Sequence, residues 1–170
     1  GLDNKVTLEL CDYRDLKGKF DRVVSIEMIE AVGEKYWIDY FKKIKEVLSK
    51  DGMAGIQVIL INNKSYERYS KSVDFIQRYV FPGGMLPSQE KLNENYKKSG
   101  LKEIQSSSFG KSYAKTLEIW HEDFINSIKS IRDLGFDSKL ERIFRYYFSY
   151  CRAGFNSEKI DVVQKIIKSA

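Results

Sequence analysis

The stretch FDRVVSIEMIEAVGEKYWIDYFKKIKEVLSKDGMAGIQVIL, residues 20–60, decides the fold. It begins with the β-branched run FDRVVSIE (20–27), which predicts a strand buried on both faces. Apolar side chains at helical spacing over 34–49 predict a helix that ends near the Asp-Gly pair at 51–52. The apolar run GMAGIQVIL (52–60) predicts a second buried strand. A strand, a helix and a strand in this order form a βαβ unit, which implies a parallel sheet covered by helices.

Elements of the same two kinds flank this unit. VTLELC (6–11) alternates apolar and polar residues, as a half-buried strand does. Apolar spacing over 66–80 predicts a helix, which ends at the loop FPGGMLPS (81–88) with both prolines. The remaining segments predict a helix over 88–99, a strand over 101–108, amphipathic helices through 117–131 and 140–155, and a closing strand over 159–167. We therefore expect residues 1–170 to form a single α/β domain.

A glycine-rich turn is missing from this pattern. Nucleotide-binding α/β domains usually open with a strand and a G-x-G-x-x-G turn, whose backbone approaches the ligand closely. The chain contains neither this motif nor G-x-G-x-G. We therefore expect an N-terminally incomplete domain, whose sheet starts partway through the fold.

Charge and hydropathy narrow the classes of partner. The net charge is +5 and the pI about 9.0, but basic and acidic residues are spread along the whole chain. This pattern favours a solvated surface with a mild attraction to an anionic membrane surface, and it argues against a nucleic-acid partner. No apolar run reaches the roughly 20 residues of a membrane-spanning helix, and the first residues lack a signal-peptide pattern. We expect a cytoplasmic protein that is peripherally associated with the membrane.

Cysteine and histidine are too scarce for most metal or nucleophile chemistry. Cys11 and Cys151 are too few for a disulfide framework or a zinc site, and we expect both to be buried thiols. His121 is the only histidine, which excludes a multi-histidine metal site and argues against a Ser-His or Cys-His pair. We predict no metal site and place His121 on a helix surface.

Five segments, in the same order and spacing, resemble one enzyme family. They are DYRDL (12–16), FDRVVSIEMIEAVGEKYW (20–37), VDFIQRYVFPGGMLPS (73–88), FGKSYAKTLEIW (109–120) and YYFSYCRAGF (146–155). Together they span essentially the whole chain, which resembles the C-terminal part of the cyclopropane-fatty-acyl-phospholipid synthase and mycolic acid cyclopropane synthase family.

The resemblance implies a Rossmann-like methyltransferase fold with helical acyl-binding insertions. It also implies S-adenosylmethionine as the one-carbon donor and the double bond of an unsaturated phospholipid acyl chain as the acceptor. In this family the methylated acyl chain becomes a carbocation, which loses a proton to a bound bicarbonate as the ring closes. Related enzymes yield methyl-branched chains instead. Two alternatives stay open: a methyltransferase for another fatty acid or a small molecule, and a non-catalytic remnant that binds lipid or a partner.

The resemblance also assigns the bicarbonate site. Glu30 matches an acidic residue that holds the bicarbonate, Tyr113 a tyrosine whose hydroxyl contacts it, and Ile59 a residue that contacts it through its backbone. Gln57 departs from the family, because the best-known cyclopropane synthases have histidine there. Glutamine donates a hydrogen bond but cannot shuttle a proton. Both ring closure and methyl branching therefore stay open as outcomes of the reaction. Glu27 has a weaker claim, since it can simply cap the strand end.

Three residues match cofactor-binding positions of the family. Asp12 and Tyr13 match positions beside the adenine, where a carboxylate accepts from an amine and a ring stacks on the base. Ile26 is expected to pack near the adenosyl group. The alternative for Asp12 is an ordinary turn after a strand.

Two expectations concern lipid and protein partners. Tyr146, Tyr147 and Tyr150 lie in an aromatic helix, which fits either a core or, in view of the family, a channel for the acyl chain. A sheet that starts partway through exposes an edge near VTLELC (6–11), which invites pairing. We therefore expect a homo-oligomer or a separately encoded N-terminal half as partner.

Overall fold

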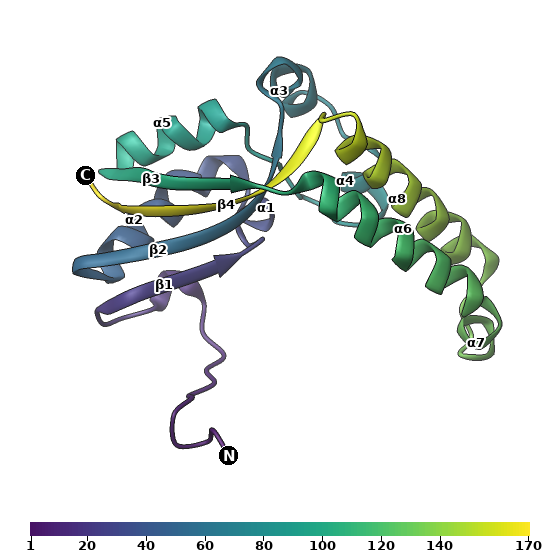
Figure 1. The fold of residues 1–170 in the computed structure, drawn as a ribbon, viewed down its shortest axis with the longest axis horizontal. Helices are drawn as coiled ribbons and strands as arrows, with labels where there is room; N and C mark the ends of the chain where they lie inside the picture. The colour runs from purple at the N-terminus through teal and green to yellow at the C-terminus, as the bar shows by residue number, and fades with distance from the viewer.

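The computed structural model describes residues 1–170 and contains one mixed four-stranded sheet (Figure 1). The strands are β1 (Phe20–Ile26), β2 (Leu48–Ile61), β3 (Leu101–Ser108) and β4 (Ile160–Ser169), in the spatial order β1-β2-β4-β3. The helices are α1 (Ile29–Val32), α2 (Trp37–Val47), α3 (Asn63–Ser70), α4 (Phe75–Tyr79), α5 (Gln89–Ser99), α6 (Gly110–Asn126), α7 (Ile128–Asp133) and α8 (Ser138–Asn156). Short 3₁₀ turns cover Tyr13–Asp15 and Glu34–Tyr36.

The predicted βαβ unit is confirmed. β1 and β2 are parallel, with Val24 opposite Gly55, and α2 connects them. The closing strand is also confirmed, and it lies between β2 and β3, antiparallel to both. The carboxyl ends of β1 and β2 therefore meet at one edge of the sheet, where open α/β sheets place their ligands.

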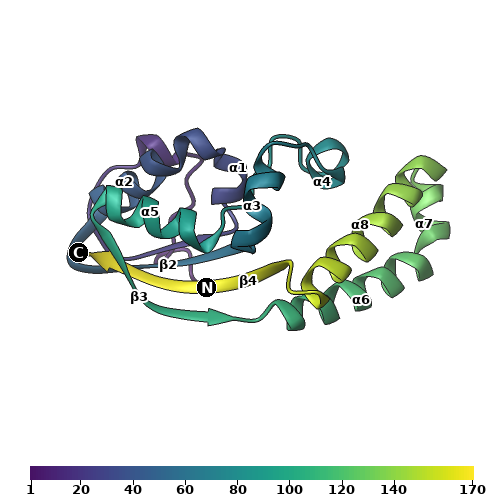
Figure 2. The same cartoon turned by 90° about the horizontal axis from the view of Figure 1, so that it is seen from above.

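Helices α2 and α5 cover one face of the sheet, whereas α6 and α8 reach the opposite face only at the start of β4. Figure 2 shows α2 and α5 lying together over the first face. Alternate residues of β2, Ala54, Ile56 and Val58, are buried in the core beneath these helices. We call the four strands with α2 and α5 the sheet body. Its largest buried side chains include Trp37 and Phe41.

The opposite face of the sheet is open at β1, which corrects the prediction for residues 20–27. β1 is an edge strand, and Val24 is 71% exposed although a strand buried on both faces was predicted. Ser25, its neighbour, instead accepts a hydrogen bond from the hydroxyl of Tyr40 in α2, at 2.7 Å. Because strand side chains alternate between faces, Val24 lies on the face opposite α2, at a position that no helix of this chain covers.

A helical hairpin, residues 110–156, is inserted between β3 and β4. α6 and α8 pack side by side and extend away from the sheet, with α7 at the far end (Figure 1). A small second core, formed by Ala114, Leu117, Phe148, Phe155 and Val162, joins the hairpin to β4. The amphipathic helix predicted through 140–155 is confirmed as α8, whereas the one predicted through 117–131 is divided between α6 and α7 at Ser127.

Two predicted elements are wrong. Residues 6–11 form no strand, and Leu8 is 92% exposed, because the alternating pattern finds no neighbouring strand to pair with. The helix predicted over 66–80 is two helices, α3 and α4. Asp74 separates them, since its carboxylate caps α4 by accepting from the backbone of Gln77, whose side chain in turn accepts from the backbone of Asp74.

Smaller differences have local causes. The helix predicted over 34–49 ends at Val47, and β2 already includes Gly52. A Cβ atom at Gly52 would lie 3.0 Å from the carbonyl oxygen of Phe20, so glycine allows β1 to approach closely. The loop over 81–88, α5 and β3 are confirmed.

The thiols and the histidine are partly as predicted. Cys11 is exposed, which corrects its prediction as a buried thiol. Cys151 is partly buried, and burial raises the pKa of its thiol to about 12. His121 lies on α6 as predicted, and its ring stacks on Phe148 with centroids 5.7 Å apart. None of the helices is both long and apolar enough to cross a bilayer.

Candidate active site

Two carboxylates gather where the chain leaves β1. Glu27 follows the last residue of β1 and has a φ of 50°, a left-handed conformation that is uncommon for any residue other than glycine. Its N–H donates to the carbonyl of Gln57 at 2.9 Å, which ties the turn to β2. Three residues later, Glu30 lies in the first turn of α1. Both side chains therefore lie at the edge where the parallel strands end.

Glu27 is the centre of a hydrogen-bond network from four elements. Its Oε1 accepts from Nε2 of Gln57 and from the hydroxyl of Tyr113, each at 2.8 Å. Nε2 of Gln164, in β4, donates to Oε1 of Gln57 at 3.0 Å. The sequence separation of Glu27 and Tyr113 is 86 residues, so the fold alone brings them together.

Glu30 is held in a different way. Its Oε1 accepts from the backbone N–H of Ile59 at 2.7 Å, whereas its Oε2 is buried without any hydrogen-bond partner. Burial raises the pKa of this carboxyl to about 7, helped by the nearby charge of Glu27 and opposed by the bond from Ile59. Near neutral pH, Glu30 is therefore present in both its neutral and its ionised form.

The residues expected to bind bicarbonate thus lie together, but their donors face protein carboxylates. Tyr113 and Gln57 donate to Glu27, and Ile59 donates to Glu30. Burial and the hydrogen bond to Glu27 raise the pKa of Tyr113 to about 12, so its hydroxyl remains a donor. A bicarbonate would find Tyr113 and Ile59 already donating to carboxylates, with only the second N–H of the Gln57 amide left, and it would face two carboxylates. As the network stands, the site does not fit bicarbonate.

The residues expected to contact the cofactor lie at the same end of the sheet. Tyr13 packs edge-on against Tyr40, at 5.9 Å between centroids, and the hydroxyl of Tyr40 reaches Ser25 in β1. Ile26 is 58% exposed at the end of β1 and presents free apolar surface. A nucleoside therefore has an accessible apolar surface here, beside the strand end.

Asp12 caps the 3₁₀ turn over Tyr13–Asp15, which agrees with the alternative prediction that this residue belongs to a turn. Its carboxylate accepts from the backbone and the guanidinium of Arg14, which lowers the pKa of Asp12 to about 2. The side chain stays solvent-accessible, and Oδ2 accepts only from Arg14 Nη2, which leaves room for a further donor. The residue therefore fits contact with an exocyclic amine as well as its turn role.

An aromatic surface lies between α4 and α8, next to the carboxylates. We define it by Phe75, Tyr79, Phe81, Tyr146, Tyr147 and Tyr150. Phe75 packs edge-on against Tyr146 at 4.5 Å, and Phe81 against Tyr147 at 6.2 Å, which joins the two helices. Burial raises the pKa of Tyr147 to about 12, with smaller contributions from Cys151 and from Glu27. The aromatic surface therefore extends to the carboxylate pair.

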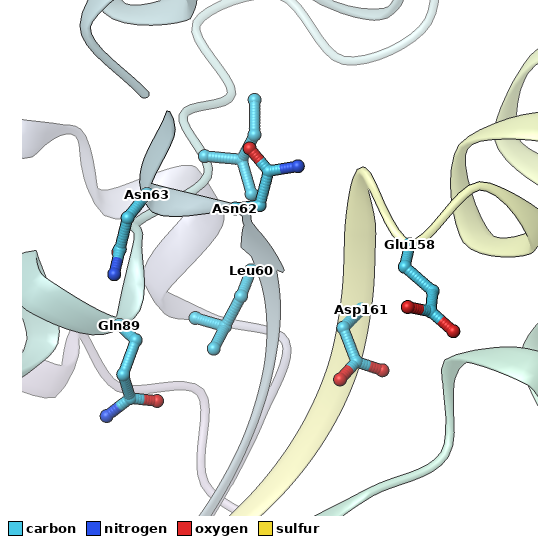
Figure 3. Close-up of a pocket in the computed structure, with 7 residues that line it drawn as sticks. Leu60, Asn62, Asn63, Gln89, Glu158 and Asp161 are labelled. Carbon is cyan, nitrogen blue, oxygen red and sulfur yellow. The ribbon is translucent and has the colours of Figure 1, made fainter. Parts of the chain in front are cut away.

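A separate cavity opens where β2 ends beside the start of β4 (Figure 3). Its volume is about 280 Å³, and it is lined by Leu60, Ile61, Asn62, Asn63, Gln89, Glu158 and Asp161. None of the expected site residues lines it. Its polar groups already have partners: Asn62 caps α3, and Asp161 accepts from the backbone of Gly110 at 2.9 Å.

Sequence reasoning missed the roles of two residues in the network. Glu27 had only a weaker claim, because its left-handed backbone and its contact with Tyr113 depend on the fold. Gln164 received no role, although an uncharged polar residue within the strand pattern IDVVQKII (160–167) was a usable signal. In β4 this side chain lies on the open face, where it reaches Gln57.

Comparison with known proteins identifies the family of this chain. The family model described as mycolic acid cyclopropane synthetase matches residues 1–165. The tuberculostearic acid methyltransferase UfaA1 of Mycobacterium tuberculosis is 37% identical over 96% of this chain and 39% of its own length. The cyclopropane-fatty-acyl-phospholipid synthase of Escherichia coli K12 is 33% identical over 98% of this chain and 41% of its own length. The chain therefore spans about 40% of the length of these two relatives.

Solved structures show the same fold. The cyclopropane synthase MmaA2 from Mycobacterium tuberculosis superposes with a TM-score of 0.83, at 24% identity, over 96% of this chain and 62% of that protein. The mycolic acid cyclopropane synthase CmaA1, complexed with SAH and CTAB, gives a TM-score of 0.81 at 24% identity, over 91% and 57%. The fold is the predicted Rossmann-like methyltransferase fold. The chain belongs to the mycolic acid cyclopropane synthetase family.

Proposed function

We propose that this chain, as a member of that family, forms the acceptor side of an S-adenosylmethionine-dependent enzyme. The enzyme transfers a one-carbon unit to the double bond of an unsaturated phospholipid acyl chain. One observation carries the proposal: a pair of carboxylates, Glu27 and Glu30, lies beside the aromatic surface. Such a reaction needs an apolar site for the acyl chain and an acceptor for the proton that the product releases.

The aromatic surface suits the acyl chain and its cation. Ring faces carry negative electrostatic potential and attract cations, so they stabilise a carbocation without forming a bond to it. Phe81 and Tyr147 are in contact next to the carboxylates, and Phe75 and Tyr146 extend the surface away from them. The double bond therefore belongs near Tyr147, with the apolar chain continuing toward Phe75.

The proposed position of the cofactor follows from Asp12, Tyr13 and Ile26. When bound, S-adenosylmethionine supplies an electrophilic methyl group. Asp12 and Tyr13 would contact its adenine, and Ile26 would pack on its adenosyl group. Ile26 immediately precedes Glu27 in the chain, so a nucleoside on Ile26 lies next to the carboxylate pair.

The first product to consider is the cyclopropane ring, formed by a cyclopropane-fatty-acyl-phospholipid synthase. A methyl-branched chain is the second, and two observations favour it. Gln57 cannot titrate at the position where the best-known cyclopropane synthases have histidine. In addition, the relative at 37% identity is named as a tuberculostearic acid methyltransferase. Both products come from the same cation by loss of a proton: the electron pair closes the ring in one case and forms a double bond in the other, which gives an unsaturated branched chain.

The acyl chain would come from a membrane that the protein contacts peripherally, on its cytoplasmic side. The far end of the helical hairpin supports this proposal. Leu134 is 76% exposed there, next to the half-exposed Phe136, and Lys129 and Lys139 flank them. Exposed apolar side chains match the interface of a bilayer, although Asp133 and Asp137 lie beside them together with the lysines.

The open sheet edge suggests a protein partner. β1 is an edge strand, and its apolar side chains Val24 and Ile26 are exposed. Exposed strand edges of this kind pair with further strands. A second copy of the chain, or a separately encoded N-terminal half, would cover this edge.

The test is product analysis of an enzyme in which this chain is extended to the full length of its relatives. We call this protein the completed enzyme. The enzyme is incubated with methyl-labelled S-adenosylmethionine and a monounsaturated phospholipid, and the released fatty acids are resolved by mass. We expect label in the acyl chain, in a cyclopropane or methyl-branched product, and none with a saturated phospholipid. Absence of label from the unsaturated chain would contradict the proposal.

A further inference from the structure

We propose that Glu27 takes the place of bicarbonate as the proton acceptor of this site. The inference rests on the proposed function for its chemistry. Its structural content, that the protein's own carboxylate occupies the anion position, is independent of that function and can be tested in this chain alone.

The orientation of Glu27 suits this role. Both hydrogen bonds to its side chain reach Oε1, from Gln57 and Tyr113. Two donors on one oxygen fix the carboxylate in place. Oε2 accepts no hydrogen bond and is the oxygen with lone pairs available for a proton.

The donors are committed to Glu27 by their own chemistry. A carboxylate only accepts hydrogen bonds, so Gln57 must turn its NH₂ group toward Glu27. Gln164 enforces this orientation, because it donates to the amide oxygen of Gln57 at 3.0 Å. Tyr113 remains protonated because burial and Glu27 raise its pKa. An external anion would have to break two of these bonds and then lie beside two carboxylates, which repel it.

The backbone at Glu27 supports a role for its side chain. A φ of 50° is strained for glutamate and easy for glycine. Glycine would therefore satisfy the turn better, yet the chain carries a side chain here that reaches two other elements. Strain of this kind is held where the surrounding contacts fix it, and such positions cluster at active sites.

The proton balance of the step is simple. The cation on the acyl chain loses one C–H proton, and the electron pair of that bond forms the third side of the ring or a new double bond. The proton passes to Oε2 of Glu27, which becomes neutral. Water then removes the proton and restores the carboxylate, so neither an oxidant nor a further reactant is required.

The first test measures bicarbonate binding to the 170-residue chain by ¹³C NMR of labelled bicarbonate. We expect no binding to the wild-type chain and clear binding to Glu27→Gly. This change empties the anion position, frees the donors of Tyr113 and Gln57, and suits the backbone. Glu158→Gly is the matched control, because Glu158 is the other non-glycine residue with positive φ, at 56°, and it has no contact with this network.

Binding of bicarbonate to the wild-type chain, undiminished by Tyr113→Phe and unchanged in Glu27→Gly, would overturn the inference. Glu27→Gln provides a second arm, since it retains the size of the side chain and should bind no bicarbonate. If Glu27→Gly fails to fold, formate titration of Glu27→Ala replaces it with the same expected gain of binding.

The second test measures turnover in the completed enzyme. We expect the wild type to be insensitive to removal of bicarbonate, and Glu27→Gly to lose about 100-fold or more. Added bicarbonate or formate should restore much of this loss in Glu27→Gly and none of it in Glu27→Gln. A wild-type rate that depends on bicarbonate would contradict the role of Glu27. A wild type that transfers no methyl group would contradict the proposed function, while the binding test still decides whether Glu27 fills the anion position.

Discussion

In the sheet body, Phe41 is 0% exposed and packs between Tyr40 and Tyr96, whereas in the helical hairpin Tyr146 is 52% exposed. The larger core, of 18 buried residues, is formed mostly by the sheet body, and the core that joins the hairpin to β4 has five. Both regions bury aromatic side chains, including Phe148 and Phe155 in the hairpin, but only the hairpin contributes to the exposed aromatic surface. Aromatic surface that stays exposed in one contiguous area usually marks a binding site. The difference teaches that the sheet body supplies stability and the hairpin supplies contact with the acceptor.

The largest effect expected from this comparison is on stability. Phe41→Ala should lower the free energy of unfolding by about 3–5 kcal/mol, because it removes a fully buried ring and leaves a cavity. Tyr150→Ala in the hairpin should cost less than about 1 kcal/mol, since its ring is already partly solvated. Urea unfolding of both variants measures the two values. Equal losses would contradict the division between the two regions.

The second effect concerns Glu30, at the junction of the two regions. Its ordinary pKa is 4.5 and burial raises it to about 7 in the folded chain, so the folded state retains a proton that the unfolded state releases. Stability should therefore fall as pH rises from about 4.5 to about 7, by up to about 3 kcal/mol. Below this window the carboxyl is neutral in both states and has no effect.

Glu30→Gln isolates this contribution, because the variant cannot ionise. We expect the variant to unfold like the wild type near pH 4 and to be more stable than the wild type above pH 7. Urea unfolding across this pH range measures the difference. A constant difference between the two proteins would show that Glu30 does not titrate in this window.

The third expected effect concerns the hydrogen bond between Tyr113 of the hairpin and Glu27 at the end of β1. Tyr113→Phe removes the only hydrogen bond from α6 to Glu27 and preserves the ring. Hydrogen bonds to charged groups contribute about 1.5–3 kcal/mol, so turnover of the completed enzyme should fall by about 10- to 100-fold. The affinity for S-adenosylmethionine should stay unchanged, because Tyr113 lies away from Asp12 and Tyr13. A weaker cofactor affinity with unchanged turnover would place Tyr113 in the cofactor site instead.

The smallest effect concerns the far end of the hairpin. Replacing both Leu134 and Phe136 by Asp should weaken binding to phosphatidylglycerol vesicles by about tenfold or more, because it removes apolar surface that the bilayer would bury. Val24→Asp, at an exposed position of the sheet body, is the control and should bind as the wild type does. Vesicle sedimentation measures all three proteins. Equal weakening by the control would place the membrane contact on the sheet body.

The sequence predicted the βαβ unit because its apolar runs reflect burial beneath α2 and α5. It did not predict that β1 is open on one face, since the same apolar residues fit a covered strand. The strand expected over residues 6–11 was wrong for a related reason. Alternation describes the residues themselves, whereas a strand also needs a neighbour that offers hydrogen bonds.

The candidate site, like the fold, could be predicted from the sequence only in part. The family pattern gathered Glu30, Gln57, Ile59 and Tyr113, which the fold indeed brings together. The pattern could not reveal that Glu27 accepts from two of these residues. That role depends on a left-handed backbone at Glu27 and on a contact across 86 residues. Neither property has a local signature in the sequence.

The most direct test of the division between the two regions is photo-crosslinking of a lipid to this chain. The probe is a monounsaturated phosphatidylglycerol with a diazirine beside its double bond, and the labelled residues are located by peptide mass spectrometry. We expect the label on the aromatic surface, within residues 75–81 and 144–150. Label found mainly on α2 and α5 of the sheet body, with none on the hairpin, would contradict the account.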